Sequence, residues 1–192
     1  MEDSAHVHRV VSDERDKLIV VDAADNAIGT LSKAACHDGD GVLHRAFSLF
    51  VFDDAGRLLL QRRAPGKRLW PGYWSNSCCS HPRSGESMEQ AIGRRLHEEL
   101  GLTCPLARLF SFTYQARFGD AGSEHEHCTV YAGRCSDDPT VNANEIDAWR
   151  WIDGETLDAE LSEDVDDVRF TPWFKIEWAR LRGDYADTIA DL

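Results

Sequence analysis

Cysteine, histidine and glutamate residues occur in this sequence at spacings that place pairs of them on one side of the backbone. Cys79 and His81 are two residues apart, and so are Glu124 and Glu126, so in an extended chain each pair projects to one face. Two further histidines lie upstream, in a polar loop that leads into an apolar stretch. Imidazoles and carboxylates together suit a divalent metal with mixed nitrogen and oxygen ligands. The candidate ligands are His37, His44, His81, Glu124 and Glu126.

A second run of charged residues predicts a helix that carries two adjacent carboxylates, Glu98 and Glu99, near its end. Negative charge at that end opposes the helix dipole, so these side chains need a positive partner. One alternative is ordinary pairing with arginines four residues earlier, which contributes about 0.2–0.5 kcal/mol per pair. The other is Mg²⁺, which commonly takes one or two carboxylates together with phosphate oxygens of a substrate. We assign the first interpretation to Glu98 and the second to Glu99.

Charge is distributed unevenly along the 192 residues, whose formal net charge is −13. Residues 136–168 contain twelve acidic side chains against the single base Arg150, which gives this stretch a net charge of −11. Residues 55–85 have the opposite balance, with six basic side chains and no acidic one. This basic segment predicts a site for a small phosphorylated ligand, and solvated surface arginines are the alternative. The net charge argues against nucleic acid and anionic membranes as partners.

The elements that must position these residues follow from hydrophobic periodicity and turn signals. Apolar residues every four positions predict a helix that begins after Ser87, with Gln90 completing a capping box, and ends at Gly101. Shorter helices are predicted at 155–161 and after Pro172. The order of elements favours a mixed α/β sandwich of the α+β class over a doubly wound sheet. The predicted strands are 18–21, 47–52, 57–62 (a hairpin with 47–52), 107–114, 127–134 and 146–152.

The helical run resembles the signature of the Nudix family, Gly-x5-Glu-x7-Arg-Glu-U-x-Glu-Glu-x-Gly-U, read here from Glu86 to Leu102. Two positions depart from it. Ser80 replaces the leading glycine, and Arg95 replaces a glutamate that binds metal in the hydrolases of the family. The resemblance therefore implies the Nudix-like fold, a mixed β-sheet sandwiched between helices in a single domain. A central positive charge argues against pyrophosphate hydrolysis.

A closer resemblance, to the type I isopentenyl-diphosphate isomerases, runs from about residue 29 to residue 175. It combines the paired upstream histidines with Tyr114, ten residues before Glu124, and the Glu-x-Glu spacing that follows. The remaining motifs are Trp-Pro-Gly at 70–72, Asn-Ser-Cys-Cys-Ser-His-Pro at 76–82 and Gly-Glu-Ser at 85–87.

This resemblance implies an enzyme that interconverts isopentenyl and dimethylallyl diphosphate, a small-molecule diphosphate substrate. It implies Cys79 and Glu126 as the catalytic pair, with Tyr114 and Trp173 lining the pocket. The diphosphate would be held by Lys33, Arg63, Lys67 and Arg95. A Mg²⁺ ion bound by Glu99 would bridge to the diphosphate. A second divalent metal (Mn²⁺, Zn²⁺ or Mg²⁺) would be bound by His37, His44, His81, Glu124 and Glu126.

Two other functions are compatible with the same fold: a Nudix pyrophosphatase acting on nucleoside diphosphate derivatives, and a non-catalytic module that binds metal or phosphorylated ligands. We expect a flexible segment at 1–16, the isomerase domain at 17–182 and a tail at 183–192. No apolar run reaches the roughly 20 residues of a bilayer span. The sequence therefore predicts a cytoplasmic protein, as a monomer or alternatively a homodimer.

Overall fold

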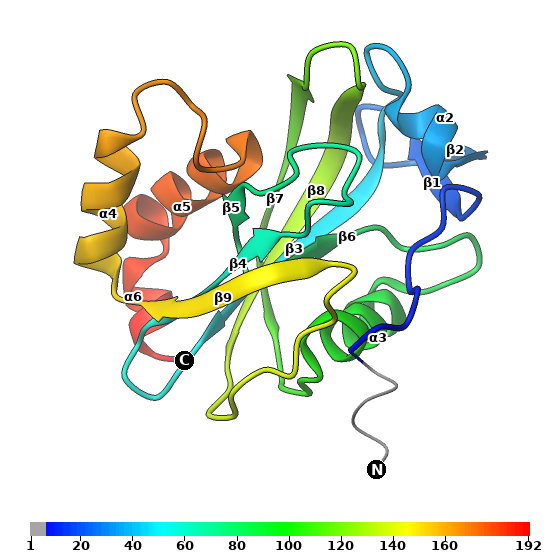
Figure 1. Ribbon diagram of the computed structural model, residues 1–192. Helices are drawn as coiled ribbons and strands as arrows, with labels where there is room; N and C mark the ends of the chain where they lie inside the picture. Colours follow the sequence, from blue (N-terminus) through cyan, green and yellow to red (C-terminus); the bar gives the residue numbers. More distant parts are fainter. Residues whose placement is uncertain (1–6) are drawn as a thin grey trace.

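Strand β3 (His44–Phe52) is the centre of the fold because it pairs with neighbours along both of its edges (Figure 1). The computed structural model describes residues 7–192. One edge of β3 pairs in parallel with β8 (Ser123–Arg134), and β8 pairs in turn with antiparallel β7 (Ala107–Arg117). The other edge pairs with the short strand β6 (Cys78–Ser80). A mixed sheet of nine strands results.

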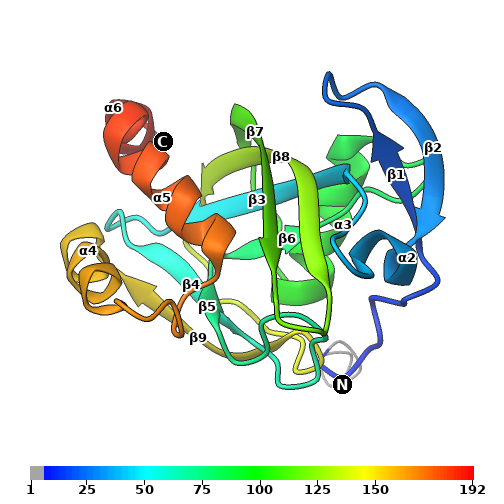
Figure 2. The same ribbon diagram turned by 90° about the horizontal axis from the view of Figure 1, so that it is seen from above.

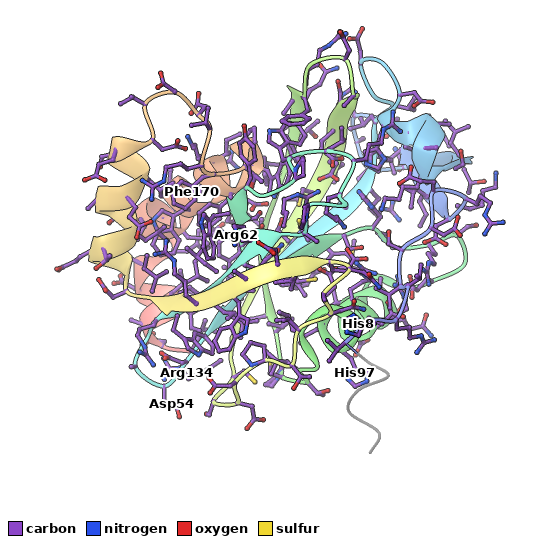
Figure 3. All side chains as sticks on the ribbon, in the orientation of Figure 1. His8, Asp54, Arg62, His97, Arg134 and Phe170 are labelled. Carbon is purple, nitrogen blue, oxygen red and sulfur yellow. The ribbon has the colours of Figure 1, made fainter. Side chains whose placement is uncertain are left out.

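The sheet is extended at both ends of β3. At its start, β3 meets β1 (Lys17–Val21), which forms a hairpin with β2 (Ala27–Ser32). At its end, the turn that contains Asp54 leads into β4 (Figure 3). Strand β4 pairs with β3 only next to this turn and then pairs with two further strands. These three strands are β4 (Leu58–Arg63), β5 (Trp74–Ser75) and β9 (Ile146–Ile152).

The predicted hairpin between 47–52 and 57–62 is wrong beyond its turn. Only Phe52 and Leu58 are in register between β3 and β4. Ser77 supplies the physical reason, because its hydroxyl accepts a hydrogen bond from the Val51 amide at 2.9 Å and donates one to the Leu59 carbonyl at 2.7 Å. Hydrogen bonds to a buried side chain thus replace the backbone hydrogen bonds that would join the two strands, and the strands are held apart.

Side chains of β3 alternate between two apolar cores, one on each face of the sheet. Phe50 packs in the core that contains α5 (Pro172–Asp184). Its neighbours Leu49 and Val51 pack in the core that contains α3 (Met88–Leu100). In Figures 1 and 2, α4 and α5 lie on one side of the central strands and α2 and α3 on the other. The predicted arrangement of a mixed sheet between helices is confirmed.

The helix over the basic and acidic run is confirmed with its caps. The Ser87 hydroxyl accepts from the Gln90 amide at 3.1 Å, and the Gln90 side chain accepts from the Ser87 amide at 2.9 Å. Gly101 ends the helix in the left-handed conformation at φ 67°. The helix predicted at 155–161 is α4 (Gly154–Glu163). Two short helices were not predicted, α2 (Lys33–His37) and α6 (Ala186–Ala190).

The two ends of the chain stay close to the domain where the structure describes them. The predicted flexible segment 1–16 begins outside the described residues. Within its described part, Val11 is buried and its carbonyl accepts from the guanidinium of Arg95 at 3.0 Å. Toward the other end, the Tyr185 ring stacks on Phe110 at 5.1 Å. Among residues 7–192, no helix has the length and apolar character needed to cross a membrane.

Gly133 on β8 allows a close approach that any side chain would obstruct. A Cβ atom there would lie 2.2 Å from the Pro105 carbonyl oxygen. We expect Gly133→Ala to lower the free energy of unfolding by about 1–3 kcal/mol, because backbone must move to relieve the clash. Gly93→Ala is the control, since Gly93 is exposed on α3 with nothing within 4 Å of its Cβ position. It should raise stability by up to about 1 kcal/mol. Urea unfolding of both variants tests this, and equal stabilities would contradict it.

Candidate active site

Five side chains with metal-binding atoms gather where β3, β8 and α2 meet. Their nearest ligand atoms all lie within 4.8 Å of one another. Separate elements deliver them: α2 ends with one histidine, β3 begins with another, and the third follows β6. The parallel register places His44 of β3 directly opposite Glu126 of β8. The cluster is the predicted set, His37, His44, His81, Glu124 and Glu126.

Backbone carbonyls orient two of the three imidazole rings. His37 donates from Nδ1 to the Lys33 carbonyl, and His44 donates from Nδ1 to the Val42 carbonyl, both at 2.7 Å. The Nε2 atom of each ring therefore faces the cluster. His44 is fully buried, and its Nε2 has no hydrogen-bond partner within the described part of the chain. An orphaned buried nitrogen of this kind is costly, so the cluster fits a divalent cation that would accept it as a ligand.

The protonation of two of the three rings suits the same role. Burial, and after it the neighbouring His37 imidazole, lower the pKa of His44 to about 4. Burial, followed by the effect of His44, also holds the pKa of His81 well below its ordinary value. Neutral imidazole is the form that binds metals. Burial would lower the pKa of His37, but the Glu124 carboxylate outweighs burial and raises it. Two carboxylates approach these rings, with Glu124 Oε2 2.7 Å from His37 Nε2 and Glu126 Oε1 2.8 Å from His81 Nε2.

Cys79 and Glu126 lie on opposite sides of β3 in the sheet order, on β6 and β8, and both line one cavity of about 180 Å³. Burial raises the pKa of the Cys79 thiol to about 12, against a smaller opposing effect of Arg63. Burial and then the Glu124 carboxylate raise the pKa of Glu126 well above its ordinary value. Tyr114, opposite Glu126 in the β7–β8 register, donates its hydroxyl to Glu126 Oε2 at 2.7 Å.

Aromatic side chains close one wall of the cavity. Trp173 stands in the first turn of α5 and is 2% exposed. Its ring lies 6.1 Å from the Tyr114 ring and meets Trp70 edge to face at 5.2 Å. The guanidinium carbon of Arg63 is 5.4 Å from the Trp173 ring centroid. Tryptophan here therefore presents an apolar, electron-rich wall beside the thiol and the carboxyl.

The basic segment at 55–85 divides into two parts in the structure. Arg57, Arg62 and Arg83 form ion pairs with Asp53, Asp147 and Asp16. The other three basic residues of the segment line the cavity, together with one basic residue from α2 and one from α3. The cations that line it are Lys33, Arg63, Lys67, Arg68 and Arg95. All four predicted diphosphate-binding residues are thus brought together at one cavity.

Comparison with known proteins agrees with this architecture. The NUDIX domain family matches residues 42–174. The crystal structure of DR0079 from Deinococcus radiodurans is similar, with a TM-score of 0.64 and 26% identity, and covers 77% of this chain and 90% of its own. A MutT protein from Methanosarcina mazei has the same fold, with a TM-score of 0.55 at 16% identity over 71% of this chain and 89% of its own.

Two sequence relatives distinguish the isomerases from the hydrolases that share this fold. Isopentenyl-diphosphate Delta-isomerase 2 of Aromatoleum aromaticum is 46% identical over 82% of this chain and 79% of its own length. Isopentenyl-diphosphate Delta-isomerase 2 of Photorhabdus laumondii is 46% identical over 82% of this chain and 88% of its own. The chain belongs to the isopentenyl-diphosphate Delta-isomerase family. Its predicted resemblance to that family is confirmed.

Two glutamates of this isomerase differ from the sequence-based expectation in whether they line the cavity. Glu99 does not line the cavity, although Arg95 does. The Nε and Nη2 atoms of Arg95 both donate to Glu99 Oε1, at 2.9 and 2.5 Å. The thiol of Cys78 approaches the same oxygen at 3.3 Å. Glu145 does line the cavity, although no motif distinguishes it from the other acids of 136–168. The one local signal for a buried position is that Glu145 directly precedes a predicted strand.

Loss of one imidazole should weaken metal binding by this isomerase. We expect His44→Gln to lower the affinity for Mn²⁺ at least about tenfold, because a buried ligand is removed from the cluster. Calorimetric titration of Mn²⁺ into protein treated with a chelator measures this. His127→Gln is the matched control: His127 lies on β8 but outside the cluster, beside Thr113. Equal Mn²⁺ affinities for both variants and the unsubstituted protein would refute the assignment.

Proposed function

We propose that this protein interconverts isopentenyl diphosphate and dimethylallyl diphosphate. The observation that carries the proposal is a single cavity whose lining has an aromatic part and a positively charged part. Cys79 and Glu126 line it together with the aromatic rings of Tyr114 and Trp173, and a group of cations lines it as well. An apolar hydrocarbon with a charged diphosphate at one end matches that division, and the relatives named above are isomerases of isopentenyl diphosphate.

The reaction moves a carbon–carbon double bond by one position. One proton is added to an alkene carbon, and another proton leaves from a carbon on the far side of the positive centre. The intermediate charge resembles a tertiary carbocation, which water would capture. An acid and a base on different walls of a closed pocket are therefore required.

Cys79 and Glu126 are the acid–base pair in this proposal. The raised pKa of the buried Cys79 thiol means that it holds its proton until an acceptor is placed beside it. The Glu126 carboxyl receives the Tyr114 hydrogen bond on one oxygen and lies 2.8 Å from His81 on the other, so its orientation is fixed from both sides. One group gives its proton to the alkene, and the other takes the proton that leaves.

Trp173 and Tyr114 stabilise the positive charge and exclude water. Both rings are buried at the cavity wall, at 2% and 8% exposure. An aromatic face attracts a cation by about 0.5–2 kcal/mol, and more where water is absent. The Trp173 ring contacts the Trp70 and Tyr114 rings, which orient it in advance toward the cavity.

Divalent cations complete the site in this proposal. The three imidazoles and two carboxylates would hold Mn²⁺, Zn²⁺ or Mg²⁺, whose charge would favour the ionised form of Glu126. Glu99 is the proposed ligand of a Mg²⁺ ion that bridges to the diphosphate. Since Glu99 pairs with Arg95 and does not line the cavity, Arg95 would have to release it when the ion binds. Lys33, Lys67 and Arg95 lie around the cavity as partners for phosphate oxygens.

Incubation of the protein with isopentenyl diphosphate and Mg²⁺ or Mn²⁺ in D₂O should yield dimethylallyl diphosphate that carries deuterium. Mass spectrometry and NMR measure both the product and the exchange. We expect Cys79→Ala and Glu126→Gln each to lower the rate by about 10²–10⁴-fold, the usual contribution of a general acid or base.

Cys104→Ala serves as the control, because Cys104 packs at the edge of the α3 core and does not line the cavity. It should retain the exchange rate of the unsubstituted protein. Full exchange in Cys79→Ala would overturn the acid–base assignment. Absence of exchange in folded, metal-loaded protein would overturn the isomerase function, and phosphate release from nucleoside diphosphate derivatives would point to the pyrophosphatase instead.

A further inference from the structure

Glu145 places a buried negative charge among the cations of the cavity. It precedes β9 and is 4% exposed. The ammonium of Lys67 donates to its Oε2 atom, and Arg95 Nη2 lies 3.4 Å from its Oε1 atom. Burial alone would raise the pKa of Glu145, but Lys67 and then Arg95 outweigh burial and lower that pKa to about 2. Glu145 is therefore a carboxylate at every physiological pH.

The cations around Glu145 already have protein partners. The guanidinium of Arg95 is occupied by Glu99, Glu145 and the Val11 carbonyl. Lys33 donates to the Ser12 hydroxyl at 2.5 Å. A diphosphate that binds here consequently competes with these partners for the same cations. Lys67 is the more accessible of the two cations that pair with Glu145, with a side chain 19% exposed against 3% for Arg95.

Transfer of Lys67 from Glu145 to a phosphate oxygen has an electrostatic consequence. Glu145, itself buried, then loses its closest counter-ion and faces a polyanion. Breaking a buried ion pair by removing one partner is strongly unfavourable, because the remaining charge is not compensated. A divalent cation that arrives on the diphosphate cancels two negative charges and supplies a positive neighbour for the carboxylate.

We propose that Glu145 is a positioning residue that makes this cavity select diphosphate complexed with a divalent cation over free diphosphate. The inference rests on the proposed function, since it takes the cavity to be the diphosphate site. Glu145 acts through Lys67 and Arg95: it occupies these cations until a ligand of reduced negative charge arrives. Its role is discrimination between two forms of one ligand, and it does not act on the hydrocarbon.

Calorimetric titration with inorganic pyrophosphate, in EDTA and in excess Mg²⁺, tests this. The unsubstituted protein should bind pyrophosphate at least tenfold more tightly with Mg²⁺. In Glu145→Gln the affinity in EDTA should rise about tenfold or more, so that the two conditions become nearly equal. Glu145→Asp should restore the dependence on Mg²⁺, because it keeps the charge. A purely structural role of Glu145 would weaken binding equally in both conditions.

Asp147→Asn is the matched control in the same segment. Asp147 pairs with Arg62 on β4, and neither residue lines the cavity. Arg62 is labelled in Figure 3. This variant should keep the dependence on Mg²⁺. An unchanged dependence in Glu145→Gln, or equal affinities in both conditions for the unsubstituted protein, would overturn the inference. Deuterium exchange of isopentenyl diphosphate is measured separately, so failure of the inference leaves an observed isomerase activity standing.

Discussion

The buried guanidinium of Arg95 joins the parts of the structure that surround the cavity. It stands on α3, is 3% exposed, and contacts Glu99 one turn later, the Val11 carbonyl and Glu145 before β9. A charge buried to this degree requires partners of opposite charge and good geometry. Three segments far apart in sequence are thereby held around one side chain. The departure from the Nudix hydrolase signature at this position is thus structural as well as chemical.

The chemistry depends equally on the two-residue period of the strands. On β3 one face packs against α5 and the other against α3, so the strand has no solvated side. On β8 the same period sends Glu124 and Glu126 to the cluster, while His127 turns to the opposite side beside Thr113. A shift of one residue in the parallel register would exchange these faces. The His/Glu cluster and the two apolar cores are therefore specified by one register.

Local sequence was sufficient for elements whose signals are local. The capping box of Ser87 and the left-handed Gly101 follow from short-range hydrogen bonds, and both are present. Resemblance to a family supplied the site residues, and the fold brings all of them except Glu99 to one cavity or to the His/Glu cluster beside it. The features that could not be predicted depend on contacts between residues far apart in the sequence. The insertion of Ser77 between β3 and β4 depends on a buried contact, and Glu145 was one acid among twelve until tertiary structure placed it beside Lys67.

The parallel pairing of β3 with β8 also has a kinetic consequence. His44 and Glu126, which face each other across it, are separated by more than 80 positions in the chain. Contacts of such long range form slowly, because a large loop must close before they contribute any stability. Local hairpins such as β1–β2 and β7–β8 can form without that closure. The His/Glu cluster therefore depends on a long-range closure, and a nascent chain acquires it only after β8 has been synthesised.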